Sequence, residues 1–153
     1  MGTHYKGPVG VRRALDTYIK LLRANDSIAS VLRAALRKDG LTIGQLGVLE
    51  ALFHLGRLSP SALADKLLTS PSNLTTLIDN LESDGMVRRD RSGGDRRSIE
   101  ISLTKAGRAR IQAVFPRHVQ RISELMSALA AEEQEVLGRL CRKLGRAAAA
   151  REP

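Results

Sequence analysis

Apolar residues recur at helical spacing along most of this chain, and they alternate with polar residues in only one short segment. The first pattern predicts a long amphipathic helix over residues 11–38, because apolar side chains three and four positions apart share one helix face. Asn25 and Asp26 weaken the middle of this pattern, so a kink or a break in the helix at that point is an alternative. Gly40 is expected to end the helix. The apolar stripe consists of Leu15, Tyr18, Ile19, Leu22, Ala29, Leu32 and Leu36.

Three shorter helices are predicted next, each opened by a start signal. Thr42 with Gln45 three residues later forms a capping box. Ser59-Pro60 and Ser70-Pro71 each place a capping serine before a proline suited to the first helical position. The predicted buried faces are Leu46, Leu49, Leu52 and Phe53, then Ala62, Leu63 and Leu67, then Leu74, Leu77, Ile78 and Leu81.

The period changes after Gly85. Ile99, Ile101 and Leu103 alternate with polar residues, which predicts a half-buried strand. Residues 86–89 are its expected partner, and the Gly-Gly pair at 93–94 allows the connection to turn at positive φ. This segment therefore predicts a β-hairpin.

The C-terminal third returns to helical spacing. Thr104 is the expected cap of a long helix, in which Pro116 should introduce a kink because it lacks a backbone donor. A last helix is predicted from about Ala131, with Glu132 and Glu133 favourably placed in its first turn. Its apolar stripe is Val136, Leu137, Leu140, Cys141 and Leu144.

The order of these elements predicts a mainly α (α+β) fold, a winged helix-turn-helix over residues 41–104. It is flanked by an N-terminal arm and helix (1–40) and by C-terminal helices (105–153). The flanking helices have apolar stripes that the compact central unit does not need. We expect these stripes to pack against the same helices of a second chain, giving a homodimer with the two-fold symmetry that a palindromic DNA site requires.

Charge and composition narrow the class of partner. The chain carries a formal net charge of +9, yet the segment 41–84 has 2 basic and 5 acidic residues, while 85–110 has 8 basic and 3 acidic. The positive charge thus gathers in the hairpin and suits a polyanion, although a merely self-repelling surface is the alternative. A single cysteine excludes an intrachain disulfide and is typical of a cytoplasmic protein, and no run is apolar enough to span a membrane.

The helix after Ser70-Pro71 and the hairpin carry the candidate DNA contacts. Short polar side chains on the outer face of that helix can approach base edges and phosphates in the major groove. For Ser72 and Asn73, capping of a solvent-exposed helix is the alternative role. The hairpin arginines suit phosphates or a narrow minor groove, and Asp95 is expected to fix Arg97 or a backbone amide. The predicted DNA contacts are Ser70, Ser72, Asn73, Thr75, Thr76, Asn80, Arg89, Arg91, Arg96 and Arg97.

Residues 41–107 resemble the MarR family of bacterial transcription regulators. The likeness rests on segments 41–49, 59–64, 73–75, 78–82 and 84–85. Its most specific part is Asp-Arg-Arg-Ser at 95–98 followed by Leu-Thr-Lys-Ala-Gly at 103–107. The resemblance implies a homodimer built by the terminal helices, a recognition helix in the major groove, a wing in the minor groove, and a repressor released by a small ligand or an oxidant.

The resemblance does not identify the effector that would release the DNA. One branch of the family senses peroxide through a cysteine in its N-terminal helix, but this chain has none there, and Cys141 fits a small buried hydrophobe on its apolar stripe. If the stripes converge, a pocket for a small aromatic or phenolic effector is expected near Tyr18, Leu22, Leu46 and Phe53.

Two other function classes fit the sequence less well. An enzyme is disfavoured because the chain shows no phosphate-binding loop, no recognisable catalytic set and no metal-ligand spacing, so no cofactor or metal is expected. An architectural or protein-interaction winged helix would need an apolar outer face on the recognition helix, and here that face is polar.

Overall fold

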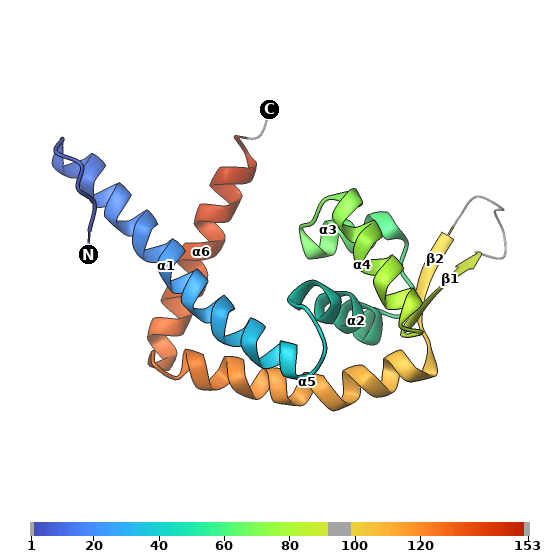
Figure 1. Cartoon of the computed structure of the whole chain (residues 1–153). Helices are drawn as coiled ribbons and strands as arrows, with labels where there is room; N and C mark the ends of the chain where they lie inside the picture. The colour runs from blue at the N-terminus through green and yellow to red at the C-terminus, as the bar shows by residue number, and fades with distance from the viewer. Residues whose placement is uncertain (1, 92–98, 152–153) are drawn as a thin grey trace. The chain divides into compact units, whose positions relative to one another are not determined.

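The computed structural model describes residues 2–91 and 99–151, apart from the side chain of Arg91. Its elements follow the predicted order (Figure 1): α1 Val9–Lys38, α2 Ile43–Leu55, α3 Pro60–Leu67, α4 Pro71–Ser83, β1 Val87–Arg91, β2 Ile99–Leu103, α5 Lys105–Met126 and α6 Ala131–Ala149. The chain divides into two compact units, residues 1–118 and 119–153. The first unit contains the predicted winged helix-turn-helix.

Helix α1 is longer and more regular than the sequence pattern indicates. It begins at Val9 and continues through Asn25 and Asp26 without interruption. Its C-terminal end is tied to α5, because Arg110 donates to the carbonyl oxygen of Asp39 and Arg117 Nη2 lies 2.6 Å from Asp39 Oδ1. These contacts hold the end of α1 against α5.

The three start signals of the short helices are confirmed. The backbone amide of Gln45 donates to Thr42 Oγ1 at 3.1 Å, and that of Thr42 donates to Gln45 Oε1 at 2.9 Å, which completes the capping box. Ser59 Oγ accepts from the amide of Ala62 at 3.2 Å. Ser70 caps α4 in the same way, so both serine-proline pairs open a helix as expected.

The hydrophobic core of the first unit lies among α2, α3, α4 and the hairpin, with additions from the end of α1 and the first half of α5. Its members come from every predicted buried face of the short helices. The buried apolar residues are Leu36, Leu41, Leu46, Val48, Leu49, Ala51, Leu52, Leu63, Ala64, Leu74, Ile78, Leu81, Val87, Ile101, Ile111 and Val114.

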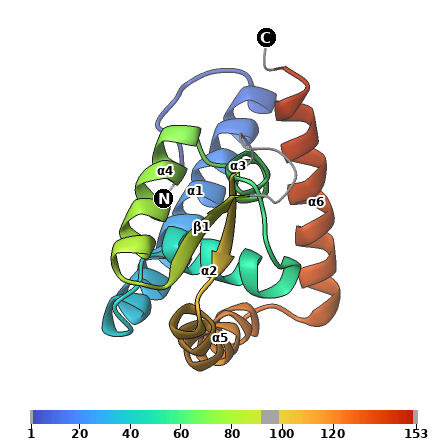
Figure 2. The same cartoon turned by 90° about the vertical axis from the view of Figure 1, so that its right-hand side faces the viewer.

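Strands β1 and β2 pair antiparallel, from Val87 opposite Leu103 to Arg91 opposite Ile99. The pair lies beside α4 (Figure 2). Ile101 is fully buried, as predicted, and forms an isolated bridge with Leu58. Ile99 is 45% exposed instead, because it lies at the end of the hairpin farthest from the core.

The corner between β2 and α5 is held by Thr104 and Gly107. Thr104 Oγ1 donates to the carbonyl oxygen of Gly85 at 2.7 Å and accepts from the amide of Gly107 at 3.0 Å. A Cβ atom at Gly107 would overlap the carbonyl group of Met86. The Leu-Thr-x-x-Gly spacing therefore packs the start of α5 against Gly85 and Met86, the residues just before β1.

Helix α5 remains helical through Pro116. In the second unit, the amide of Ala130 donates to Glu133 Oε2 at 2.8 Å, and Gln134 Nε2 donates to the carbonyls of Met126 and Leu129. Helix α6 has no buried residue, so the expected burial of Cys141 does not occur within one chain. None of the helices in the described ranges is both long and apolar enough to cross a membrane.

Candidate nucleic-acid interface

Helix α4 separates its apolar and polar residues onto two faces. Leu74, Ile78 and Leu81 are buried in the core, and Leu77 is half-buried beside them. The opposite face is exposed along the whole helix. It carries Ser72, Asn73, Thr75, Thr76, Asp79 and Asn80, and the capping Ser70 is exposed as well. The predicted α4 residues are thus brought together on one accessible polar surface, the α4 outer face.

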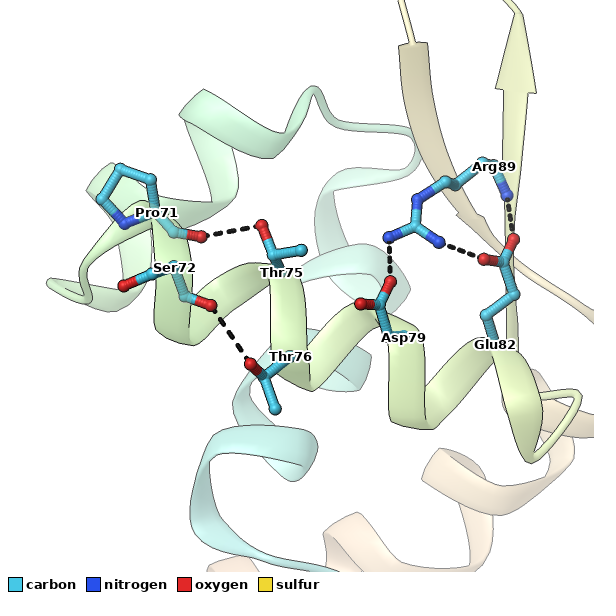
Figure 3. Close-up of polar contacts among 7 residues, drawn as sticks. All are labelled: Pro71, Ser72, Thr75, Thr76, Asp79, Glu82 and Arg89. Atoms are coloured by element: carbon cyan, nitrogen blue, oxygen red, sulfur yellow. Dashed lines mark hydrogen bonds and ion pairs between the residues drawn. The ribbon is translucent and has the colours of Figure 1, made fainter.

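The threonines of this face turn their hydroxyl groups back along the helix. Thr75 Oγ1 donates to the carbonyl oxygen of Pro71 at 2.9 Å, and Thr76 Oγ1 donates to that of Ser72 at 3.2 Å. Figure 3 shows both hydroxyls directed toward the preceding turn and both methyl groups directed away from it. The hydroxyl hydrogens are therefore engaged within α4.

Asn73 and Ser72 are also partly engaged near the start of α4. Asn73 Nδ2 donates to Thr69 Oγ1 at 2.6 Å, and the hydroxyl oxygens of Ser70 and Ser72 lie 3.2 Å apart. An asparagine side chain has two donor hydrogens and one acceptor oxygen. The contact with Thr69 uses one donor and so orients the amide at the helix start without exhausting it.

Arg89 connects β1 to α4. Its Nη2 lies 2.5 Å from Asp79 Oδ1, its Nη1 pairs with Glu82 Oε2, and its backbone amide donates to Glu82 Oε1 at 3.1 Å (Figure 3). The hydrogen bond with Asp79, helped by the charge of Glu82, raises the pKa of Arg89 above its ordinary value. The arginine neutralises two acids of α4, a role that the sequence interpretation of Arg89 as a DNA contact did not anticipate.

A second polar cluster lies across β1 and β2. Ser102 Oγ donates to Asp90 Oδ2 at 2.6 Å, and Arg88 Nε lies 3.1 Å from Asp90. The hydrogen bond from Ser102, with the positive charges of Arg88 and Arg57, lowers the pKa of Asp90 below its ordinary value. Sequence reasoning missed Asp90. Strand alternation places positions 88, 90 and 102 on one face and was the available signal.

Part of the predicted wing lies outside the described residues. This holds for Asp95, Arg96 and Arg97 and for the side chain of Arg91, while the backbone of Arg91 pairs with Ile99.

The residues predicted for an effector pocket have different surroundings. Tyr18 and Leu22 are exposed on α1, and Leu46 is buried in the core. Phe53 packs against the core, with the guanidinium of Arg108 5.5 Å from its ring centroid and the ring of His54 at 5.1 Å. The pocket remains a prediction.

A separate cavity of about 610 Å³ lies at the N-terminal arm and includes His4 and Tyr5 in its lining. Over the described ranges, no three histidine, cysteine, aspartate or glutamate residues are grouped so that they could hold a metal ion.

Comparison with known proteins gives consistent results. The MarR family model matches residues 41–99. The chain is 31% identical over 133 residues to the HTH-type transcriptional regulator MhqR of Bacillus subtilis (strain 168), an alignment covering 87% of this chain and 92% of MhqR.

Two solved structures share the fold. Sco3205, a MarR family transcriptional regulator from Streptomyces coelicolor crystallised in complex with DNA, matches with a TM-score of 0.84 and 23% identity over 94% of this chain and 91% of its own. BpsR of Bordetella bronchiseptica, whose DNA binding is regulated by 6-hydroxynicotinic acid, matches with a TM-score of 0.76 and 22% identity over 84% of this chain and 98% of its own. The match to the MarR family model and the relationship to MhqR lead to one conclusion: this chain belongs to the MarR family of transcriptional regulators.

Proposed function

We propose that this regulator binds a palindromic duplex DNA operator as a homodimer, with α4 in the major groove and the hairpin beside it. The observation that carries the proposal is the exposed polar α4 outer face next to an arginine-bearing hairpin. A helix that buries its apolar side and presents short polar side chains can enter the major groove closely. The DNA complex of Sco3205 supports the same use of this fold.

The proposed DNA contacts have two roles. The α4 residues Ser72, Asn73, Thr75, Thr76 and Asn80, with Ser70 at the cap, face base edges and the adjoining phosphates. The wing arginines Arg91, Arg96 and Arg97 bind phosphates or the minor groove, with Asp95 organising the loop. Arg89 supports the interface from within by neutralising Asp79 and Glu82.

The dimer would use the flanking segments 1–40 and 105–153, with residues 41–104 as the DNA-binding unit. Large apolar side chains are exposed on each flanking helix, among them Leu21, Ile28 and Val31 on α1 and Leu140 and Leu144 on α6. Contiguous exposed apolar surface marks an interaction site in a water-soluble protein. A second copy would cover these residues and place two α4 helices about one DNA turn, roughly 34 Å, apart.

DNA binding is tested by titrating the full chain against random and palindromic duplexes at several salt concentrations. Arg97→Ala should weaken binding by about 1–3 kcal/mol per contact and lower the salt slope by about one unit per half-site if it binds a phosphate. Unchanged affinity and slope would contradict the assignment of Arg97. Equal affinity for all duplexes would favour the architectural alternative, which the polar α4 outer face disfavours.

For regulation, we propose that a small aromatic effector releases the DNA by changing the separation of the two α4 helices. The regulation of BpsR by 6-hydroxynicotinic acid supports this class of ligand. A hundredfold preference for one spacing corresponds to roughly 2.7 kcal/mol. Cys141 is exposed, so its oxidation is the competing mechanism. If Cys141→Ser binds normally but no longer releases DNA with peroxide, while the parent chain does, the thiol is the sensor.

A further inference from the structure

The α4 outer face has an unusual composition for a surface proposed to contact DNA. Helix α4, Pro71–Ser83, contains no lysine or arginine. Lysine and arginine are the side chains that pair with O6 and N7 of guanine, which is the commonest base-specific contact in protein–DNA complexes. The helix therefore lacks the standard means of recognising a G·C pair through guanine.

Arg89, a β1 residue that contacts α4, directs its guanidinium at two acids of the helix. Both terminal nitrogens of Arg89 are engaged, one by Asp79 and one by Glu82. The same contact engages one carboxylate oxygen of Asp79 and offsets its charge, and Asp79 is the exposed acid of this face that could accept a hydrogen bond from N4 of cytosine. Guanine therefore has no lysine or arginine of α4 to pair with, and the ion pair with Arg89 competes with cytosine for Asp79.

The threonines present methyl groups instead. Because the hydroxyls of Thr75 and Thr76 donate to the carbonyls of Pro71 and Ser72, their methyl groups point away from the preceding turn (Figure 3). A threonine methyl makes apolar contact with the C5-methyl group of thymine in the major groove. The internal hydrogen bonds fix this orientation before DNA binds, so little side-chain entropy is lost on contact.

Asn73 and Asn80 complete the pattern. Both are exposed on the α4 outer face, about two helical turns apart. An asparagine side chain can pair with N6 and N7 of adenine through one oxygen and one donor hydrogen. Asn73 still has its oxygen and one donor hydrogen after its contact with Thr69.

From these observations we infer that α4 recognises A·T pairs, with Thr75 and Thr76 against thymine methyl groups and Asn73 and Asn80 against adenine. The operator half-sites are therefore A·T at the base pairs that α4 contacts. This inference rests on the proposed function, since it specifies the DNA that the proposed interface selects.

The first test is selection of duplexes from a random library by the full chain, followed by footprinting of the selected site. We expect A·T pairs at the major-groove positions protected in each half-site. Selected half-sites with G·C pairs at those positions would overturn this inference and leave the proposed function standing. Failure to enrich any sequence would overturn the proposed function, and this inference with it.

The second test removes single methyl groups from both partners. Replacing thymine by uracil at a contacted position should weaken binding about fourfold, the equivalent of about 0.8 kcal/mol for one buried methyl group. Thr75→Ser and Thr76→Ser keep the hydroxyl but lose the methyl. In the variant whose methyl makes the contact, the uracil substitution should cause no further loss, because the two changes remove the same interaction.

A matched control is Thr17→Ser on α1. Thr17 Oγ1 donates to the carbonyl oxygen of Arg13 at 2.8 Å, so this threonine has the same internal hydrogen bond at an exposed helical position away from α4. Thr17→Ser should keep the full effect of uracil. Equal binding of thymine and uracil duplexes by the parent chain, or additive losses in both α4 variants, would overturn the inference.

Discussion

The winged-helix unit and the terminal helix α6 have similar apolar stripes but opposite surroundings. In α2 and α4 the stripe is covered within one chain, so that Leu49 and Leu81 are fully buried. In α6 the stripe is open, and Leu140 and Leu144 are each more than half exposed. The difference shows that helical spacing identifies a face that must be covered but does not say whether the same chain covers it.

The polar faces of the two regions differ as well. The α4 outer face carries no basic residue, whereas α6 carries Arg139, Arg142, Lys143 and Arg146 beside its apolar stripe. Positive charge alone would therefore place a DNA contact on α6. The proposed division gives DNA recognition to the helix with a closed core and self-association to the helix with an open stripe.

The same leucine-to-alanine substitution should lower the stability of the fold in one region and weaken self-association in the other. Leu49→Ala removes a fully buried side chain and should lower the free energy of unfolding by about 2–5 kcal/mol at every protein concentration. Leu140→Ala should leave the winged-helix unit folded and weaken self-association by about 2 kcal/mol or more, because a symmetric interface loses the side chain twice. Urea unfolding and sedimentation at several concentrations separate the two effects.

A role of Leu140 in self-association would be contradicted if Leu140→Ala lowered the free energy of unfolding equally at all protein concentrations without changing the sedimenting mass. Such a result would mean that the α6 stripe is covered within its own chain.

Glycine substitutions sharpen the contrast between the closed and open regions. Gly107→Ala should destabilise the winged-helix unit by about 1–3 kcal/mol, because the new methyl group overlaps the Met86 carbonyl. Gly138→Ala on α6 is the matched control, since nothing lies within 4 Å of its added Cβ. There the change should stabilise the helix by roughly 0.5–1 kcal/mol. Thermal unfolding followed by circular dichroism measures both, and loss of stability in the control would show that its site is covered in the dimer.

Removing the arginine that neutralises the acids of α4 should have a smaller effect, and that effect should be on DNA binding. Arg89→Ala should weaken DNA binding by about 1 kcal/mol per half-site, the scale of a close pair of exposed charges, because Asp79 and Glu82 then face the phosphates without a partner. The substitution should change the free energy of unfolding by less than about 1 kcal/mol, since the ion pairs of Arg89 with Asp79 and Glu82 are accessible to solvent.

The triple variant Arg89→Ala/Asp79→Asn/Glu82→Gln distinguishes neutralisation from direct contact. If Arg89 acts by neutralising the acids, the triple variant should recover most of the lost affinity. Persistent weakness with a lower salt slope would instead identify Arg89 as a phosphate contact.

The smallest expected effect is on the pH dependence of the hairpin. The folded-state pKa of Asp90 is lowered, so its contribution to stability is present above its unfolded pKa of about 3.9 and is lost as the pH falls through the folded value. Ser102→Ala should raise the pKa of Asp90 by removing the largest single cause, and Arg88→Ala should raise it as well by removing a positive charge and a hydrogen bond. Titration of the Asp90 carboxyl by NMR measures the shift. An unchanged pKa in Ser102→Ala would rule out the hydrogen bond as its cause.

Local signals in the sequence predicted most of the fold. Capping residues and prolines act within one helical turn, so Thr42, Ser59 and Ser70 marked helix starts that the structure confirms. The alternation of β2 predicted the burial of Ile101 but not the exposure of Ile99, because burial depends on how far the core extends along the strand.

The site was less predictable where it depends on contacts between elements. The α4 outer face follows from helical spacing alone. Arg89 meets Asp79 and Glu82 only once β1 lies beside α4, and sequence patterns do not determine which side chain completes such a pair. The open stripe of α6 could be recognised as apolar, but its exposure in one chain required the structure.

In the proposed dimer, a second copy covers the open stripes and so presents two α4 helices to one operator. Sedimentation of the full chain, alone and with a selected duplex, distinguishes this dimer from a regulator that acts as one chain. We expect a folded species of twice the 16.7 kDa chain mass at micromolar concentration and two chains on each duplex at saturation. A stable, folded species of one chain mass that binds the duplex as a single chain would contradict it.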